Sequence, residues 1–357
     1  MATASQPRIE VLLEEVVKRN ASDLHLQVGQ PPTLRVDGAL VSMENLAPLT
    51  EESAEQLIFS ILDEEQKQML LKDKEFDFSF AFGDEARFRV NAFHERGNLA
   101  AALRLIPNEI RTIEQLNLPK ILNGFTDYPR GLVLVTGPTG SGKSTTLAAM
   151  IDKINSEKSV HIITIEDPIE YTHKSKKSMV VQREVHYDTY SFAAALRSTL
   201  REDPDVVLIG EMRDLETIAA AITIAETGHL VLATLHTNSA AQSIDRMVDV
   251  FPPHQQQQIR VQLAAILQGI CSQRLIPQIG GGRVPGTEIL VATSAVRNIV
   301  REGKTHQLDA VIQTGAEKGM QSMDRALVNL IHAGTITYEE AKNYALDLEE
   351  LDRLMRG

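Results

Sequence analysis

A glycine-rich segment near the middle of the chain has the residue types and spacing of a phosphate-binding loop. Residues 137–145 satisfy the pattern G-x-x-x-x-G-K-[ST]. They are Gly137, Pro138, Thr139, Gly140, Ser141, Gly142, Lys143, Ser144 and Thr145. An apolar strand is expected at 131–136 and a helix at 145–154, so the loop has the structural context of the motif, which argues against a turn without a ligand.

The chemistry of this loop follows from its residue types. Its glycines let backbone N–H groups curl around a β-phosphate, and the N-terminus of the next helix adds its dipole. We expect Lys143 to reach the β- and γ-phosphate oxygens and the Ser144 hydroxyl to bind Mg²⁺. The sequence therefore predicts that the chain binds a nucleoside triphosphate, ATP with Mg²⁺, and hydrolyses it.

Acidic residues follow two further apolar runs that are expected to be buried strands. The run 206–209 leads through a glycine to Glu211, the position of a Walker B acid that would serve the metal or the water. A solvent-facing acid is the alternative, but open α/β sheets bind ligands at this edge. Glu166, Asp167 and Glu170 follow the other run, and one of them would polarise the attacking water while the others orient helices or basic residues. Their spacing leaves that choice open.

Histidines and arginines supply further candidates. His229 and His236 flank the apolar run 230–235. His236 lies at the strand end expected to face the nucleotide, whereas a structural role is as well supported for His229. Arg197 and Arg201 are one turn apart on a helix expected at 191–202. They would pair with the acidic cluster, approach a phosphate, or simply lie on a solvated face.

The pattern of elements divides the chain into two domains. At 357 residues the chain is longer than a typical domain with a single hydrophobic core. Residues 1–106 combine an amphipathic helix, alternating strands and one or two further helices, typical of a small α+β domain. Prolines bound a linker at 107–118. In 119–357, apolar strands alternate with helices, which predicts a parallel α/β sheet, and the Gly280–Gly282 turn leads into a helical C-terminal region.

Composition limits the classes of function. No run approaches the ~20 apolar residues that span a bilayer, and the single cysteine, Cys271, excludes a disulfide framework and a cysteine-based zinc cluster. These features predict a cytoplasmic protein. A net charge of −12 disfavours nucleic-acid binding.

These motifs together resemble those of the PilT-type retraction ATPases in the type II/IV secretion ATPase superfamily. The resemblance covers nearly the whole chain. It rests on the phosphate loop, on an Asp box at 165–171, on Glu211, on a His box with His229 and His236, and on the helix motif at 295–302.

The resemblance implies a homohexameric ring in which a PAS-like N-terminal domain and a RecA-like ATPase domain move during the ATP cycle. The motor would drive type IV pilus retraction and twitching motility at the inner-membrane base of the pilus, through a platform protein. Arg89 and Arg104 become candidates for cations that reach the triphosphate. From their strands alone, both could equally lie on exposed faces.

The helix at 295–302 gains its interest from the same resemblance. Its apolar face would contain Val296, Ile299 and Val300, and its polar face would include Arg297. Any packed surface helix shows such a pattern. If the helix transmits force, loss of the Arg297 side chain should stop twitching and leave ATP hydrolysis near the wild-type rate.

Several other functions compete with a retraction motor. A pilus assembly or type II secretion ATPase commonly carries an extra N-terminal domain and a four-cysteine insertion, which we do not expect here. A retraction-assisting paralogue is harder to separate. A RecA-like nucleic-acid motor would use the same loop, but the acidic balance disfavours it. A non-catalytic scaffold would not need Lys143, Ser144 and Glu211 together.

Overall fold

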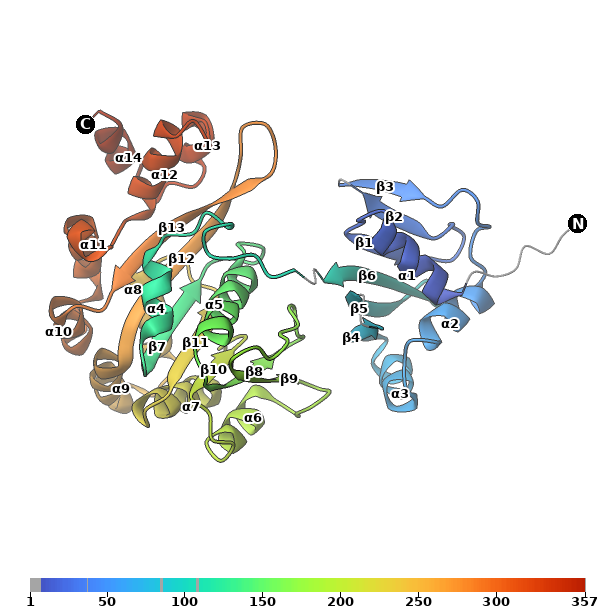
Figure 1. The fold of residues 1–357 in the computed structure, drawn as a ribbon, viewed down its shortest axis with the longest axis horizontal. Helices are drawn as coiled ribbons and strands as arrows, with labels where there is room; N and C mark the ends of the chain where they lie inside the picture. The colour runs from blue at the N-terminus through green and yellow to red at the C-terminus, as the bar shows by residue number, and fades with distance from the viewer. Residues whose placement is uncertain (1–7, 37, 84–85, 107–108, 357) are drawn as a thin grey trace, which may run out of the picture. The chain divides into compact units, whose positions relative to one another are not determined.

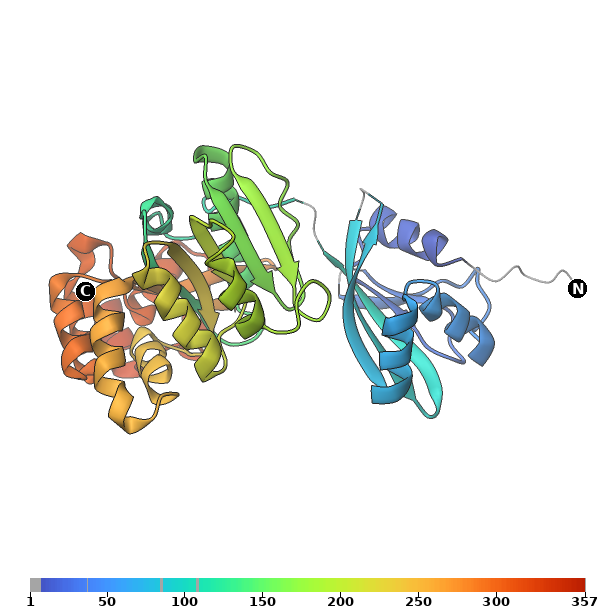
Figure 2. The ribbon, with the colours of Figure 1, turned by 90° about the horizontal axis from the view of Figure 1, so that it is seen from below.

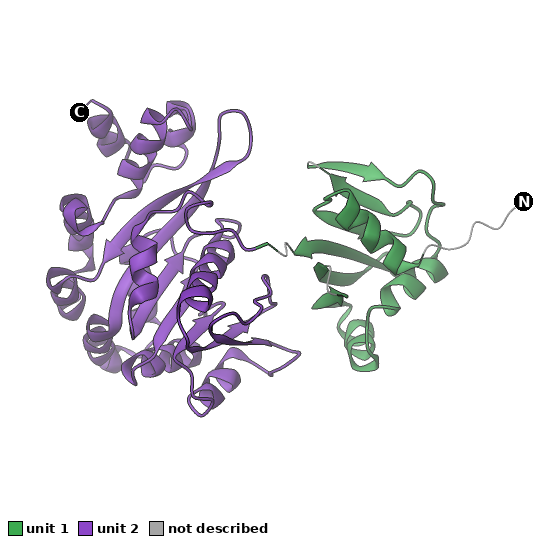
Figure 3. Ribbon diagram, viewed as in Figure 1, with its two compact units in different colours: residues 1–109 green, residues 110–357 purple. Residues whose placement is uncertain are grey.

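The chain forms two compact units, which are coloured separately in Figure 3. A computed structural model describes residues 8–36, 38–83, 86–106 and 109–356. Unit 1 comprises residues 1–109 and unit 2 residues 110–357.

The division between the units falls within the segment 107–118, where the sequence indicates a linker. Residues 107 and 108 lie outside the described residues. Ile113 and Leu118 are buried in a hydrophobic cluster of unit 2. The part of the segment that contains these two residues is therefore packed in the core of unit 2.

Unit 1 is an antiparallel sheet with helices packed against it (Figures 1 and 2). Its elements are α1 (Ile9–Lys18), β1 (Asp23–Leu26), β2 (Thr33–Val36), β3 (Ala39–Ser42), α2 (Glu51–Phe59), α3 (Glu64–Asp73), β4 (Glu75–Phe82), β5 (Ala86–Glu95) and β6 (Asn98–Ile106). The strand order is β3-β2-β1-β6-β5-β4. Strand alternation builds the core, because Phe88 and Val90 are buried while Arg89 between them lies on the opposite face.

Unit 2 is a mostly parallel sheet covered by helices on both faces (Figure 1). Its first half contains α4 (Ile121–Asp127), β7 (Gly131–Thr136), α5 (Lys143–Glu157), β8 (His161–Glu166), β9 (Met179–Glu184), α6 (Phe192–Thr199), β10 (Val206–Ile209), α7 (Leu215–Glu226) and β11 (Leu230–Leu235). Its second half contains α8 (Ala240–Asp249), α9 (Pro253–Ile266), β12 (Leu267–Pro277), β13 (Arg283–Val291), α10 (Ser294–Glu302), η1 (Thr305–Gln307), α11 (Leu308–Thr314), η2 (Ala316–Lys318), α12 (Met323–His332), α13 (Tyr338–Lys342) and α14 (Leu348–Met355).

The strands of this sheet follow the order β13-β12-β7-β11-β10-β8-β9. Only β13 runs antiparallel to its neighbour among the described strands. Leu132 and Leu134 of β7 pack toward α7 to α9, whereas Val133 and Val135 pack toward α4 and α5. Because both faces are buried, the strand has the continuous apolar sequence that predicts a parallel sheet.

The structure also corrects the expected course of the C-terminal region. The Gly280–Gly282 turn connects two long strands, β12 and β13, and the helices begin only at Ser294. Strand β9 was likewise not expected from the sequence. None of the helices in the described part of the chain is both long and apolar enough to cross a bilayer.

Gly269 in β12 provides a test of this packing. A Cβ at position 269 would overlap the buried ring of Phe125 in α4. We expect Gly269→Ala to lower the free energy of unfolding of unit 2 by about 1–3 kcal/mol, because a packed core accommodates an added methyl group only by distortion. Chemical denaturation followed by circular dichroism would measure the change.

Gly124 in α4 is the matched control for this substitution. A Cβ at position 124 would have no neighbouring atom within 4 Å. Gly124→Ala should leave stability unchanged or raise it slightly, because alanine favours the helix. Equal effects of the two substitutions would contradict the packing described for Gly269.

Candidate functional site

Four loops meet at one edge of the unit 2 sheet (Figure 1). Parallel pairing aligns the last residues of the central strands, with Leu235 beside Thr136, and Ile209 beside both Ile165 and Ala233. The phosphate loop, the acidic cluster, Glu211 and His236 follow these strand ends directly. The structure therefore brings together the main site candidates from the four central strands.

The phosphate loop folds around its own lysine. Gly142 has a φ of 87° and precedes the first turn of α5, a conformation that favours glycine. The Lys143 ammonium donates hydrogen bonds to the carbonyls of Gly137 and Pro138, at 2.9 and 3.0 Å. The side chain thus lies inside the loop, where these carbonyls hold it.

Two carboxylates act electrostatically on this lysine. Burial lowers the pKa of Lys143, while the charges of Glu211 and Glu170 act in the opposite direction. Glu170 is therefore the member of the acidic cluster whose charge acts on the loop lysine. The positive charge of the loop is balanced by acids from two different strand ends.

Glu211 is the centre of a small charged group. Its carboxylate is paired with Arg213, and its Oε1 atom lies 3.0 Å from His236 Nε2. Burial, and then the charge of Lys143, lower the pKa of His236, so its ring beside Glu211 is neutral near pH 7. The glycine before Glu211 permits this arrangement, because a Cβ at Gly210 would be only 3.2 Å from Ile165 O in β8.

Glu166 lies in a different environment from Glu170. Its Oε1 atom accepts hydrogen bonds from Thr164 Oγ1 at 2.6 Å and from Gln182 Nε2 at 3.1 Å. Burial raises the pKa of Glu166 to about 6 despite these bonds. The structure thus fastens this carboxyl group between β8 and β9.

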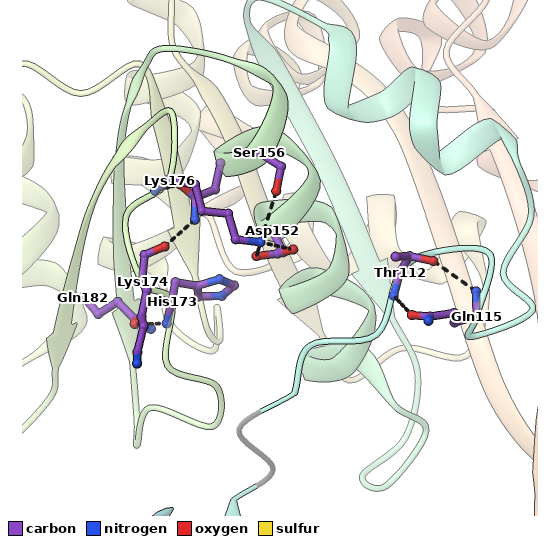
Figure 4. Close-up of polar contacts among 9 residues, drawn as sticks. Thr112, Gln115, Asp152, Ser156, His173, Lys174, Lys176 and Gln182 are labelled. Atoms are coloured by element: carbon purple, nitrogen blue, oxygen red, sulfur yellow. Dashed lines mark hydrogen bonds and ion pairs between the residues drawn. The ribbon is translucent and has the colours of Figure 1, made fainter. Parts of the chain in front are cut away.

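The segment after the acidic cluster is anchored on α5, the helix that follows the phosphate loop (Figure 4). Lys176 Nζ donates to Asp152 at 2.7 Å and to Ser156 at 3.1 Å. Nearer the loop, the hydroxyl groups of Thr145 and Tyr171 are 2.9 Å apart. These contacts keep the acidic cluster in a fixed position relative to the loop.

Other candidates lie away from this edge. His229 lies at the opposite end of β11, where its Nδ1 atom is 3.1 Å from Thr227 Oγ1 and 3.0 Å from Ile224 O. Arg197 is exposed and lies 3.6 Å from Glu216 of α7. Arg201 is exposed beyond the end of α6, so the two arginines do not share the helix expected from the sequence.

Arg89 and Arg104 are direct neighbours on the sheet of unit 1. They are paired across β5 and β6. Arg104 Nε donates to Asp23 Oδ1 at 2.8 Å, and its side chain is 71% exposed. The structure places the two cations side by side on the face that the core does not use.

Arg297 differs from its expected position on the polar face of α10. Its guanidinium donates to the carbonyls of Ala264 and Ala265, at 2.7 and 2.8 Å, and to Gln268 Oε1 at 3.1 Å. These carbonyls belong to the last turn of α9, which lacks partners within its own helix. Arg297 therefore ties α10 to the end of α9, and the exposed polar face retains Asn298, Arg301 and Glu302.

Sequence reasoning missed three residues that shape the site. Arg213 pairs with Glu211, Gln182 bonds Glu166, and Tyr171 reaches Thr145. Arg213 follows Glu211 by two residues, a spacing that could have drawn attention to it. Gln182 belongs to a strand that the sequence did not reveal.

The oxygen atoms at this edge suit a hard divalent cation. Ser144 offers a hydroxyl at the start of α5, and Glu211 a carboxylate at the end of β10. Mg²⁺ prefers oxygen ligands and usually takes several from water and phosphate. The described residues contain no cluster of three or more His, Cys, Asp or Glu side chains suited to a metal. A cation here would accordingly depend on the phosphates for most of its ligands.

The sheet and the loop at its edge define a P-loop nucleotide-binding protein. The family model described as type II/IV secretion system protein matches residues 3–343, and the chain belongs to this family. It is 52% identical to the type IV pilus retractation ATPase PilT of Pseudomonas aeruginosa over 94% of this chain and 98% of that protein. It is 41% identical to the type IV pilus ATPase PilU of the same organism, over 97% and 90% of the two chains.

A solved structure of a related protein has the same fold. The crystal structure of the pilus retraction motor PilT with bound ADP matches with a TM-score of 0.92 and 50% identity. The match covers 97% of this chain and 99% of that chain.

The environment of Glu166 predicts a pH-dependent stability. Because its folded-state pKa is about 6, above the ordinary 4.5, the folded protein holds a proton that the unfolded chain releases. Stability should therefore fall as the pH rises from below 4.5 to above 6, by about 2 kcal/mol in all from this group. Glu166→Gln should remove that part of the decline in urea unfolding curves recorded across this range.

An exposed carboxylate provides the control for this titration. Glu317 lies on the surface in η2. Glu317→Gln should keep the wild-type pH profile. An unchanged decline in Glu166→Gln would show that other groups cause it.

Proposed function

We propose that this chain is an ATPase that powers type IV pilus retraction. The observation that carries the proposal is the meeting of Lys143, Glu211 and His236 at one sheet edge, in a chain that matches a pilus retractation ATPase along nearly its whole length. The loop supplies the phosphate site, and the surrounding acids and histidine supply charge at the reacting end.

Lys143 and Ser144 hold the triphosphate in this mechanism. The lysine ammonium already lies against the loop carbonyls of Gly137 and Pro138. Phosphate oxygens replace these acceptors when nucleotide binds. Ser144 and Glu211 would hold Mg²⁺, which would neutralise negative charge on the triphosphate.

Glu170 is the better placed of the two glutamates to polarise the attacking water. Its charge acts on Lys143. Glu166 instead accepts bonds from Thr164 and Gln182, which suits a residue that holds the acidic cluster in place. In this scheme Glu211 binds the metal side of the site, while His236 and Arg213 orient its carboxylate.

Two arginines of unit 1 are our candidates for cations that bind the triphosphate. Arg89 and Arg104 form a pair on the face of the sheet that the core does not use, and a triphosphate carries the negative charge that such a pair can bind. The chain would act as a homohexamer at the inner-membrane base of the pilus, bound to a platform protein. ATP hydrolysis would then change the relation between the units.

Glu211→Gln tests the chemical step. The amide keeps the size of the side chain but loses its charge, so we expect nucleotide to bind while kcat for ATP hydrolysis falls about 100-fold or more. A malachite-green phosphate assay and ADP titration would measure the two quantities. Glu216→Gln, at an exposed carboxylate of α7, is the control and should hydrolyse ATP normally.

An unchanged kcat in Glu211→Gln would remove this residue from the mechanism. Loss of ADP binding together with hydrolysis would indicate a role in holding the nucleotide. The first result would leave the phosphate loop as the binding site and require another acid at the metal.

The cellular prediction concerns retraction itself. Deleting the gene in its host should leave pili on the surface and abolish twitching, since a retraction motor removes pili that another motor assembles. Loss of pili would instead indicate an assembly motor. Electron microscopy and a stab-agar motility assay would distinguish the two outcomes.

The same strain allows a test of α10 as a contact for the pilus machinery. Arg301→Glu reverses an exposed charge, so complementation should restore ATP hydrolysis and leave pili on the surface, but it should not restore twitching. Arg297→Ala is the matched comparison, and the bonds to α9 lead us to expect loss of stability and of both activities. Normal twitching in Arg301→Glu would exclude this position from the contact.

A retraction-assisting paralogue is the second candidate function. The chain also matches a second type IV pilus ATPase, PilU, at 41% identity over nearly its full length, so a paralogous pilus motor is the alternative. Deletion of such a paralogue from a host that has its own retraction motor would reduce twitching without abolishing it.

A further inference from the structure

Gln273 of β12 contacts the phosphate loop from beneath. Its Nε2 atom donates to the carbonyl of Ser141 at 2.7 Å, and its Oε1 atom accepts from Thr146 Oγ1 at 2.8 Å. The side chain is only 3% exposed, and both bonds are buried. One glutamine amide thus joins the loop to the first turns of α5.

The bond to Ser141 fixes the direction of a peptide group. In a planar trans peptide the C=O and the following N–H point in opposite directions. With the Ser141 carbonyl directed down to Gln273, the N–H of Gly142 points away from β12. That direction leads toward the side of the loop where a phosphate binds in this class of motif.

The glycines of the motif are distributed in agreement with this role. A Cβ at Gly137 would overlap the Gln273 carbonyl oxygen, and one at Gly142 would lie 2.8 Å from Gln273 Nε2. At Gly140, by contrast, no atom lies within 4 Å of such a Cβ. Gly142 therefore makes room for the Gln273 side chain and Gly137 for the backbone of that residue, while Gly140 borders open space.

Loss of the two hydrogen bonds of Gln273 would be strongly destabilising. A buried donor or acceptor that is left without its partner costs more free energy than an intact hydrogen bond contributes to stability. Removal of the amide would leave the Ser141 carbonyl and the Thr146 hydroxyl unpaired below the loop. The peptide between Ser141 and Gly142 would then be free to rotate away from its phosphate-binding orientation.

We propose that Gln273 is a positioning residue of the nucleotide site, which holds the Ser141–Gly142 peptide so that its N–H faces the β-phosphate. This inference rests on the proposed nucleotide-binding function. It assigns the orientation of the loop to a residue 132 positions further along the chain, on a strand outside the motif. The donor end of the amide, toward Ser141, carries the effect, and the acceptor end steadies α5.

The test compares binding of ADP and of inorganic tripolyphosphate to the full-length chain by calorimetry. Gln273→Leu should weaken both about tenfold, because the contact acts on the phosphates and removes two buried bonds. Thr146→Val removes only the bond at the acceptor end and should stay within about twofold of wild type. Gln273→Glu keeps an acceptor for Thr146 but loses the donor, so it should resemble Gln273→Leu.

Gln321→Leu is the matched control. Gln321 also joins two atoms through its amide, Thr287 O at 2.9 Å and Thr287 Oγ1 at 3.1 Å, away from the loop. This variant should bind both ligands with wild-type affinity. Thermal unfolding of each variant establishes which of them are folded.

The outcomes separate this inference from the proposed function. Wild-type affinity in a folded Gln273→Leu or Gln273→Glu chain overturns the role of Gln273, as does an equal loss in Gln321→Leu. If neither Gln273 variant folds, the affinity of the folded Thr146→Val chain decides. A loss of tenfold or more overturns the assignment of the effect to the donor end of the amide, and wild-type affinity supports that assignment. A wild-type chain that binds neither ligand overturns the nucleotide function, and this inference with it.

Discussion

Parallel strand pairing is the constraint on which the candidate site depends. Parallel neighbours run in the same direction, so every strand that enters the sheet at one edge leaves it at the other. The loops after β7, β8, β10 and β11 therefore meet, although they are separated by up to about 100 residues of sequence. Helices on both faces bury the sheet beneath these loops. Parallel pairing is therefore sufficient to bring the candidate site residues together.

Charge balance is the second condition that the site fulfils. A buried ammonium group is costly unless carboxylates or carbonyl oxygens surround it. Lys143 has both, in the loop carbonyls and in the charges of Glu211 and Glu170. Arg213 and His236 in turn occupy the Glu211 carboxylate. The charges of the loop are thus compensated within the chain, and a phosphate enters by exchanging partners that already exist.

The sequence predicted the parts of this arrangement that local patterns encode. The central strands are continuous apolar runs, and the loop motif has a fixed spacing, so both were found from the residues alone. Strand β12 was missed because its buried Ser272 and Gln273 interrupt any apolar or alternating pattern. The side of α10 on which Arg297 lies was also beyond reach, since it depends on the carbonyls of a different helix. Long-range polar contacts leave little periodic signal.

The two faces of strand β12 make different contacts, so the strand is sensitive to insertions and deletions. Gln273 bonds the phosphate loop, while the next residue, Arg274, donates to Tyr344 O in the C-terminal region at 3.1 Å. A shift by one residue along a strand exchanges its faces. A single deletion between the register irregularity at Leu267/Gly269 and Gln273 would place an arginine below the loop and a shorter strand against the C-terminal helices. A change in the length of this strand should therefore disturb both the phosphate loop and the C-terminal region at once.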